Sequence, residues 1–506
     1  MSSLVQNTLL VSGGAALVGV PLGGLLAWLI VRTDVPGRRL AAAILAVMLF
    51  VPLYLQAAAW QAGFGLEGAV TLGMRLSLWL EGLNGAIFLH GMAAVPWAAL
   101  IIGVALRSVP ADWEELALLD GSAPQVFVRV TLRLVMPAIG LAALLAAMVA
   151  ATEIVVTDLC IVRTYAEEVY MQFTLGDQNS AVLRLLPGVG VTAVLLLLGL
   201  LLARAAAPRH WDLAGRPPRL VALGHWRWPA AMAMLLVLLL VAGLPLGSLL
   251  WKAGVVVEQT ATGRERVWSV AKFAGMIGSA PWRFRRELEW TFLIGGLAAA
   301  AAIVSAIPLA WLARRGGWRA APALLVVAAG LSVPGPLVGI VLIRLLNGTH
   351  APDWLAMLYS HSILAPWLAL WVRAMPVAVI VLWHAMSSIP RELEDVAALD
   401  GCGPVRRLLF LALPMRYGAV AAAFLLALAV TFGEVSASIL VLPPGVMTVA
   451  NQVFSLMHYG VEDQVAAICL ANLAIVAVLV AAVAWLMRGG QRPQAVSADP
   501  AATIME

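Results

Sequence analysis

The feature that most constrains this chain is a series of apolar runs, each of about 20 residues, separated by short segments that hold most of the charge. A run of that length can cross the hydrocarbon core of a bilayer as a single helix. A soluble domain needs a charged surface, whereas these 506 residues are 62% hydrophobic and only 12% charged. We therefore predict an all-α polytopic membrane protein.

About eleven runs (10–12) qualify as transmembrane helices. They lie at about 9–31, 40–62, 84–106, 134–156, 181–203, 229–251, 289–313, 320–343, 361–385, 414–436 and 463–487. The first run lacks a basic segment before it, so a cleaved signal peptide is not expected. The predicted organisation is a first repeat at 1–203, a linker rich in Arg and Pro at 204–228, a second repeat at 229–487 and a polar tail at 488–506.

Arginine placement predicts the orientation. The short segments that would share a side with 107–133 and 386–413 are rich in Arg, and those on the other side are poorer in it. Because basic loops stay in the cytoplasm, we predict that both of these segments are cytoplasmic, with the N-terminus outside and the C-terminus inside. The segment 252–288 conflicts with this prediction, because it is placed outside and yet carries several Lys and Arg residues.

Two of the cytoplasmic segments match each other at a separation of 280 residues, as Pro110 and Pro390 illustrate. Each is predicted to be a short helix, at 110–121 and 390–401. The proline suits the first helical position, acidic residues suit the positive end of the helix dipole, and a final glycine suits a left-handed closing residue. The matching residues are Pro110, Glu114, Ala117, Leu119, Asp120 and Gly121, and Pro390, Glu394, Ala397, Leu399, Asp400 and Gly401.

The pattern Glu-x-Ala-x-x-x-Gly in these segments resembles the EAA loop of permease subunits in ATP-binding-cassette importers. In the second copy Asp395 replaces the family's glutamate, which shortens the reach of the carboxylate. The resemblance implies that each segment is a coupling helix that seats in a groove of an ATPase subunit; the competing interpretation is an ordinary charged loop. The coupling residues it implies are Glu114, Glu115, Ala117, Asp120, Gly121, Glu394, Asp395, Ala397, Asp400 and Gly401.

The family pattern continues with a proline about 13 residues after the glycine. The second copy has it, as Leu413-Pro414, whereas Arg133 stands near that place in the first copy and Pro137 follows it. The helical spacing of Trp113, Leu116 and Ala117 gives the first segment a small apolar face for a partner.

The chain has no GxxxxGK[ST] motif, so we expect it not to be an enzyme and to hold no cofactor. ATP would be bound by a partner ATPase in two copies, one for each repeat. The resemblance also implies a soluble substrate-binding protein, periplasmic or lipid-anchored, and a place in the bacterial cytoplasmic (inner) membrane. We expect no nucleic-acid partner, since no exposed basic domain is present, and no metal site, since Cys160, Cys402 and Cys469 are far apart.

Glu153 and Glu434 end equivalent spans after the two coupling segments, and Arg373 lies near the middle of another span. Ionisable residues in spans face the interior or a water-filled path by default. The two carboxylates could therefore line the transport path, or they could be solvated or ion-paired helix ends. Arg373 could pair with Glu434 or bind an anionic substrate.

The layout of the chain, with Pro443-Pro444-Gly445 as an outer turn, resembles fused ferric-iron permeases and their thiamine, sulfate and phosphonate relatives. We predict ferric iron as the substrate, since paired carboxylates suit a hard cation. The alternatives are thiamine or an anion such as phosphonate or sulfate. An ion-gradient-driven secondary transporter is a different class, against which the repeated cytoplasmic loops argue. A membrane enzyme has no supporting cluster of nucleophile, base or metal ligands.

Overall fold

The computed structural model describes residues 2–65, 80–174, 219–260, 263–348, 351–459 and 462–489, with isolated positions between 68 and 71 and between 194 and 201. Nearly all regular structure in these residues is helical, so the predicted all-α polytopic fold is confirmed. Most of the predicted span 181–203, most of the linker 204–228 and nearly all of the tail 488–506 lie outside the described residues.

Seven long segments are apolar enough to cross a membrane. They are formed by α1 (Ser2–Arg32), α5 (Gly82–Arg107), α7 and α8 (Ala123–Val126 and Leu132–Thr152), α12 and α13 (Arg227–Leu238 and Leu244–Gly254), α15 (Arg285–Ala313), α19 (Leu364–Ser387) and α25 (Glu462–Gly489). Large apolar side chains such as Leu17, Val304 and Val478 are exposed along them, as expected for helices that face lipid.

Three further predicted spans are broken helices. The bend is 107° between α2 (Arg38–Met48) and α3 (Leu53–Phe64). It is 105° between the segment Gly317–Ser332, which contains α16 (Ala321–Ser332), and α17 (Gly335–Asn347). It is 80° between the segment Pro404–Met415, which ends in α22 (Leu413–Met415), and α23 (Tyr417–Gly433). The first two bends fall at Val51-Pro52 and Val333-Pro334. Proline lacks the N–H that would continue the helix and favours an extended residue before it. The spans predicted at 40–62 and 320–343 are therefore each bent beside a proline.

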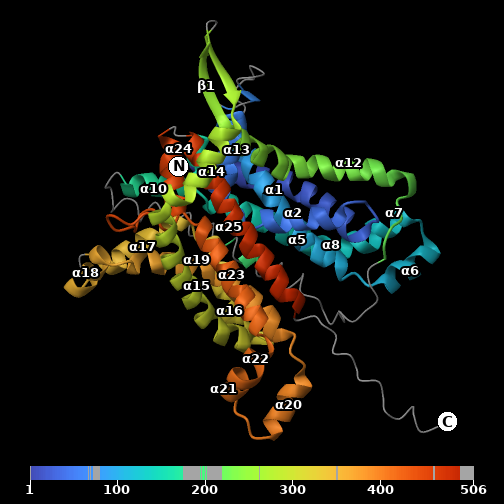
Figure 1. Cartoon of the computed structure of the whole chain (residues 1–506). Coiled ribbons are helices and arrows are strands. Elements are labelled where there is room, and N and C mark those ends of the chain that lie inside the picture. The colour runs from blue at the N-terminus through green and yellow to red at the C-terminus, as the bar shows by residue number, and fades with distance from the viewer. Residues whose placement is uncertain are drawn as a thin grey trace, which may run out of the picture.

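The helices form two groups that meet near one end and diverge toward the other (Figure 1). The diverging ends carry α6 (Ala111–Asp120) and α20 (Arg391–Leu399), which we call the coupling face. The opposite face carries α10 (Tyr165–Thr174) and α24 (Val449–His458). There α10 packs against α17 and α24 packs against α3, so each short helix contacts the other half of the chain.

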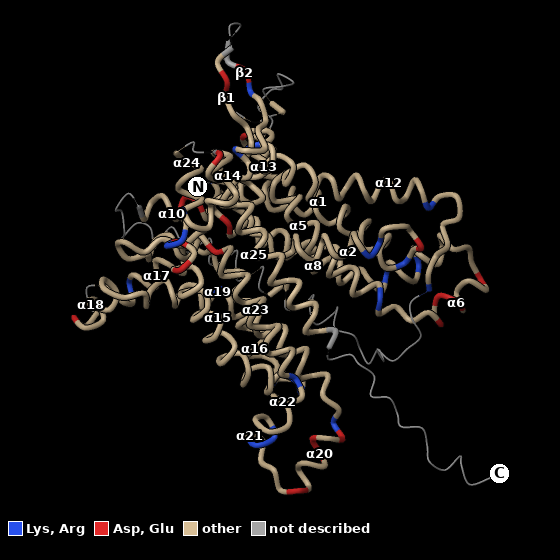
Figure 2. The backbone as a smooth tube through the Cα atoms, in the orientation of Figure 1, with Lys and Arg blue, Asp and Glu red and all other residues tan. Residues whose placement is uncertain are grey.

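The segment 252–288, predicted as a loop, is folded. Strands β1 (Val255–Thr260) and β2 (Gly263–Trp268) pair as an antiparallel hairpin, and α14 (Val270–Arg283) follows. The Lys272 ammonium donates to the carbonyl of Val255 at 2.6 Å and pairs with Asp463 at 3.3 Å, which fixes the base of the hairpin to α25. Acidic and basic residues both occur along the strands (Figure 2), so this segment is not a purely basic loop.

Helices α1 and α5 pack closely because small residues face each other. A Cβ placed on Gly23 would lie 2.6 Å from the Cβ of Ala98, and one on Gly19 would lie 2.7 Å from the Cβ of Ala94. Without a hydrophobic driving force between helices in lipid, such close contact is a main source of helix association.

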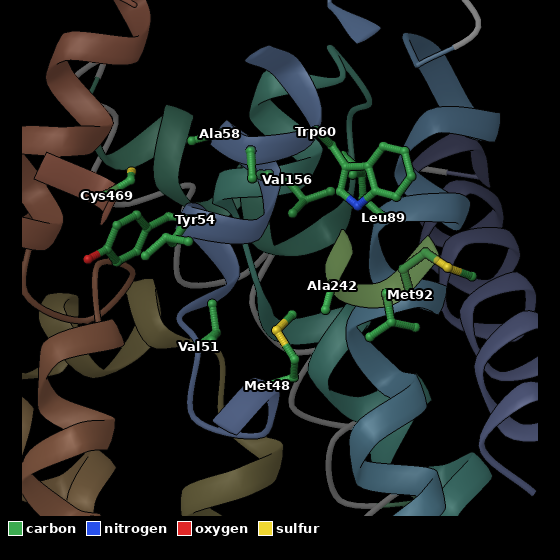
Figure 3. Close-up of a cluster of buried hydrophobic side chains, with 14 of the residues drawn as sticks. Met48, Val51, Tyr54, Ala58, Trp60, Leu89, Met92, Val156, Ala242 and Cys469 are labelled. Carbon is green, nitrogen blue, oxygen red and sulfur yellow. The ribbon is translucent and has the colours of Figure 1, made fainter. Parts of the chain in front are cut away.

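A buried polar contact joins the two halves just after the first bend. The Tyr54 hydroxyl donates to the carbonyl of Phe432 at 3.3 Å and accepts a hydrogen bond from the Asn472 amide. Figure 3 shows the Tyr54 ring beside Cys469, in a cluster of buried side chains that also includes Val51 and Met48. Because Tyr54 belongs to α3 and its partners belong to α23 and α25, this contact helps to fix α3 against the second half.

We expect Tyr54→Phe to lower the thermal unfolding temperature of the detergent-solubilised protein. The change leaves a buried carbonyl and a buried amide without their hydroxyl partner, at a cost of about 1–3 kcal/mol. Tyr417→Phe is the matched control, because that ring is 75% exposed. Equal unfolding temperatures for the two variants would contradict the proposed contact.

Candidate coupling helices and transport path

The two predicted coupling helices are present, with different ends from those expected. Helices α6 and α20 begin at Ala111 and Arg391, so Pro110 and Pro390 are the capping residues before the first turn rather than the first helical residues. Both prolines are extended, with ψ of 128° and 132°, which suits a residue that leads into a helix.

The closing glycines differ between the two copies. Gly401 has φ +77°, the left-handed conformation that was predicted. Gly121 has φ −154°, which is extended, so that prediction is wrong for α6. The chain leaves α6 directly into α7, whose first turn is closed by reciprocal hydrogen bonds between Ser122 and Gln125. An extended link is sufficient there because the next helix begins within two residues.

Each coupling helix is tied to a long helix by a buried ion pair. In the first half, the Glu114 carboxylate accepts hydrogen bonds from Arg32, the last residue of α1, and from Thr131. In the second half, Glu394 accepts two hydrogen bonds from Arg314, at 2.8 and 2.6 Å, just beyond the end of α15. The same tie therefore occurs at the same place in both halves.

Burial and hydrogen-bond geometry favour both ion pairs. Side-chain exposure is 4% and 6% for Arg32 and Glu114, and 6% and 13% for Arg314 and Glu394. Arg314 binds bidentately and stacks on the Trp311 ring, with its guanidinium carbon 3.1 Å from the ring centroid. The hydrogen bonds from Arg314 lower the pKa of Glu394 below its ordinary value, so the carboxylate stays charged at neutral pH.

The opposite side of each coupling helix carries exposed apolar residues three positions apart. Their exposure ranges from 41% at Leu393 to 87% at Leu399. Residues at this spacing share one helix face, and an exposed apolar face indicates a protein contact. The residues are Trp113, Leu116 and Leu119 on α6, and Leu393, Val396 and Leu399 on α20.

The other predicted coupling residues lie around this face. Ala117 and Ala397 are half-buried, and the exposed members of the set are Glu115, Asp120, Asp395 and Asp400. The carboxylate that resembles the family's EAA glutamate is thus exposed in both halves, and the preceding glutamate forms the tie. The role of all these residues in contacting an ATPase stays a prediction.

The predicted path residues lie where their helices end. Glu153 follows α8, and its two carboxylate oxygens accept the backbone N–H groups of Val155 at 2.7 Å and Val156 at 3.0 Å. Glu434 follows α23, and it accepts the N–H of Ala437 and the Nε of Arg373, both at 2.9 Å. The two carboxylates lie close enough to interact electrostatically.

Glu153 and Glu434 differ in whether an arginine from the equivalent position pairs with them. Arg373 neutralises Glu434 and also donates to the carbonyls of Gly330 and Val333 beside the bend between α16 and α17. When Pro96 of α5 is aligned with Pro376 of α19, Ala93 stands where Arg373 does. Glu153 therefore has no equivalent arginine. Of the two predicted roles of Arg373, the pairing with Glu434 is the one observed.

Sequence reasoning missed Arg32, Arg314 and Thr131. The two arginines could have been found, because each directly follows an apolar run at the same place in its half. Thr131 carries no such signal. Among the described residues, no group of three or more His, Cys, Asp or Glu side chains is arranged to hold a metal ion.

A multi-span helical protein with two repeated, membrane-tethered short helices is typical of transport subunits. The family model for binding-protein-dependent transport system inner membrane components matches residues 19–212 and 299–489. Because the match covers more than half of the chain, the chain belongs to this family of permease subunits of ATP-binding-cassette importers. The segment 213–298, with the hairpin, lies outside both matches.

The chain is also similar to putrescine transport system permease protein PotI of Escherichia coli strain K12 and of Escherichia coli O6:H1. Each is 28% identical over 193 residues, which is 38% of this chain and 67% of the relative. Family membership makes the chain a multi-span subunit of the inner membrane. It also implies partners of two kinds, an ATPase and a substrate-binding protein.

We expect Glu394→Ala to free α20 from α15. Removing one partner of a buried ion pair costs about 3–5 kcal/mol, so amide hydrogen exchange in residues 391–399 should accelerate by about 100-fold or more. The lowered pKa of Glu394 means that the wild-type tie persists at neutral pH and is lost only as pH falls through that pKa. Glu392→Ala, an exposed acid on the same helix, is the control. Equal exchange in both variants would show that Glu394 does not hold α20.

We expect Arg373→Ala to destabilise the protein strongly, because it leaves Glu434 buried without a counter-ion, at a cost of about 3–5 kcal/mol. Adding Glu434→Gln removes the uncompensated charge, so the double variant should recover part of the lost thermal stability. A double variant less stable than Arg373→Ala alone would contradict the pairing.

Proposed function

We propose that this chain is the fused transmembrane subunit of an ATP-driven importer for a small organic cation, and that one ATPase subunit binds at α6 and a second at α20. The observation that carries this proposal is the pair of tied helices, each with an exposed apolar face. In this proposal the coupling face is cytoplasmic, the N-terminus lies outside and the C-terminus lies inside. The predicted repeats, 1–203 and 229–487, each supply one coupling helix.

The ties give the mechanism a physical basis. A displacement of α6 by its ATPase would be passed through Glu114 and Arg32 to α1, and a displacement of α20 through Glu394 and Arg314 to α15. If ATP closes the ATPase pair, the two halves approach at the coupling face. The contacts of α10 with α17 and of α24 with α3 would then separate at the opposite face. ATP favours this state only because the closed ATPase pair binds it better.

The cation is proposed from two observations. The relatives are putrescine permeases by name, and putrescine is a diamine. Among the described residues, no arginine is seen to pair with the Glu153 carboxylate, whereas Arg373 is already neutralised by Glu434. The pairing of Arg373 weakens the anion alternatives, phosphonate and sulfate. Thiamine, which is an organic cation, belongs to the proposed class. The ferric-iron prediction has no support from the relatives or from a metal-ligand group among the described residues.

The docking proposal is tested by co-purification with the ATPase subunit. Leu119→Glu and Leu399→Glu place a charge in the exposed apolar face of each coupling helix. We expect the double variant to lose the ATPase subunit while the ties to α1 and α15 persist. Asp112→Asn with Glu392→Gln, two exposed acids outside the predicted coupling residues, is the control for a change of charge alone. Full retention of the ATPase by the double glutamate variant would contradict docking on these faces.

The substrate proposal is tested by uptake into proteoliposomes that contain the complex and its binding protein. We expect ATP-dependent uptake of putrescine and no uptake of ferric iron, sulfate or phosphonate. Robust uptake of iron or of an anion, without uptake of any organic cation, would contradict the proposed substrate class and leave the docking proposal untouched.

A further inference from the structure

Basic residues gather where α14 ends and α15 begins. Arg283 is the last residue of α14, and Arg285 and Arg286 are the first two residues of α15. All three are exposed, whereas Phe284 between them is buried and anchors the turn. We call residues 282–286 the basic corner. It lies outside both family matches, and it holds three of the seven Lys and Arg residues that conflict with the predicted orientation.

One of these arginines is held by its own chain. The Nε of Arg285 donates to Glu289 at 2.6 Å, and its guanidinium carbon lies 5.4 Å from the centroid of the Trp282 ring. A guanidinium group over an indole ring is a favourable contact. Trp282 is nevertheless 76% exposed. The basic corner therefore presents an aromatic ring at the surface beside its charges.

Arg283 and Arg286 supply the uncompensated charge of the basic corner. In the part of the chain that the structure describes, no hydrogen bond or ion pair involves either guanidinium group. The adjacent acid, Glu287, is half-buried, and its buried Oε2 atom has no hydrogen-bond partner among the same residues. These two arginines can therefore bind an anion that comes from outside the chain.

Arg286 stands at the end of a stripe of apolar side chains on α15. Leu293, Leu297 and Val304 follow it by 7, 11 and 18 residues, so all four lie on one face of the helix. The three apolar residues are 48%, 48% and 71% exposed. Exposed apolar side chains along a membrane span face lipid. The face of α15 that carries Arg286 is therefore the face that lipid covers.

The basic corner also lies at the depth of lipid headgroups. The apolar part of α15 runs from Trp290 to Ala313 without a charged residue. At about 1.5 Å per residue it is about 36 Å long, enough to cross the hydrocarbon core. Arg286 is about one turn beyond it. Tryptophan is enriched at this depth, which agrees with the exposed ring of Trp282. Because α15 ends beside the coupling face, its first turn lies at the opposite face.

The chemistry of the corner suits a phosphate group. The planar fork of a guanidinium group matches phosphate oxygens, and an anionic membrane surface attracts basic side chains. A soluble protein partner would first meet the hairpin, which projects beyond the helices (Figure 1). The continuity of Arg286 with the lipid-facing stripe therefore favours a lipid over a protein.

We propose that the basic corner binds the phosphate headgroup of an anionic phospholipid in the leaflet at the opposite face. Arg283 and Arg286 hold the phosphate, and an acyl chain lies along Leu293 and Leu297. The bound lipid neutralises the arginines and fixes the junction of α14 and α15 at the membrane surface. This proposal does not depend on which solute is transported.

The test compares unfolding temperatures of the complex with its ATPase subunits in two kinds of nanodisc. One contains phosphatidylcholine alone, and the other also contains phosphatidylglycerol. We expect phosphatidylglycerol to raise the unfolding temperature, and Arg283→Gln with Arg286→Gln to lose more than half of that rise. In phosphatidylcholine alone the double variant should match the wild type, since neither arginine holds another described side chain. Arg264→Gln with Arg266→Gln removes the same charge from β2 and should keep the full rise.

Four results would overturn the proposal. The first is a full rise with phosphatidylglycerol in the Arg283 and Arg286 double variant. The second is an equal loss of unfolding temperature in both lipids, which would make the arginines structural. The third is an equal rise when inorganic phosphate is added to phosphatidylcholine nanodiscs, which would indicate a site for a free anion. The fourth is a full lipid effect together with weaker attachment of the substrate-binding protein, which would indicate a protein contact.

Discussion

The buried pairing of a carboxylate with a guanidinium at each coupling helix is the interaction on which the rest of this structure depends. Every residue of α20 except Glu394 and Ala397 is exposed, so little else holds this helix to the membrane domain. Removing two charges from water costs free energy, and their mutual attraction offsets that cost only when the geometry is good. The bidentate contact of Arg314 with Glu394 supplies this geometry. A short polar helix thus becomes a rigid extension of a long apolar one.

Most of the fold could be predicted because the bilayer sets the length of each apolar run. The described residues contain seven long apolar helical segments and three bent pairs, and each lies at a predicted span. The bends at Pro52 and Pro334 could not be predicted from hydropathy, which measures only apolar content. Proline alone is no guide either, since Pro96 and Pro376 lie inside unbroken helices. The hairpin was missed because its segment was treated only as a connection between spans.

The candidate sites were predictable in part. The repeat identified both coupling helices, but it could not show which of two adjacent acids is buried, because that depends on how the helix docks. Arg373 and Glu434 were recognised as possible partners since buried charges need counter-ions.

The central claim, that each coupling helix moves with its long helix as one body, is tested most directly by distances between spin labels in the assembled complex. One pair of labels at Glu392 and Trp318 spans the tie in the second half, and another at Asp112 and Glu392 spans the two coupling helices. We predict that ATP shortens the second distance and leaves the first unchanged. A change in the first distance as large as that in the second would contradict the claim.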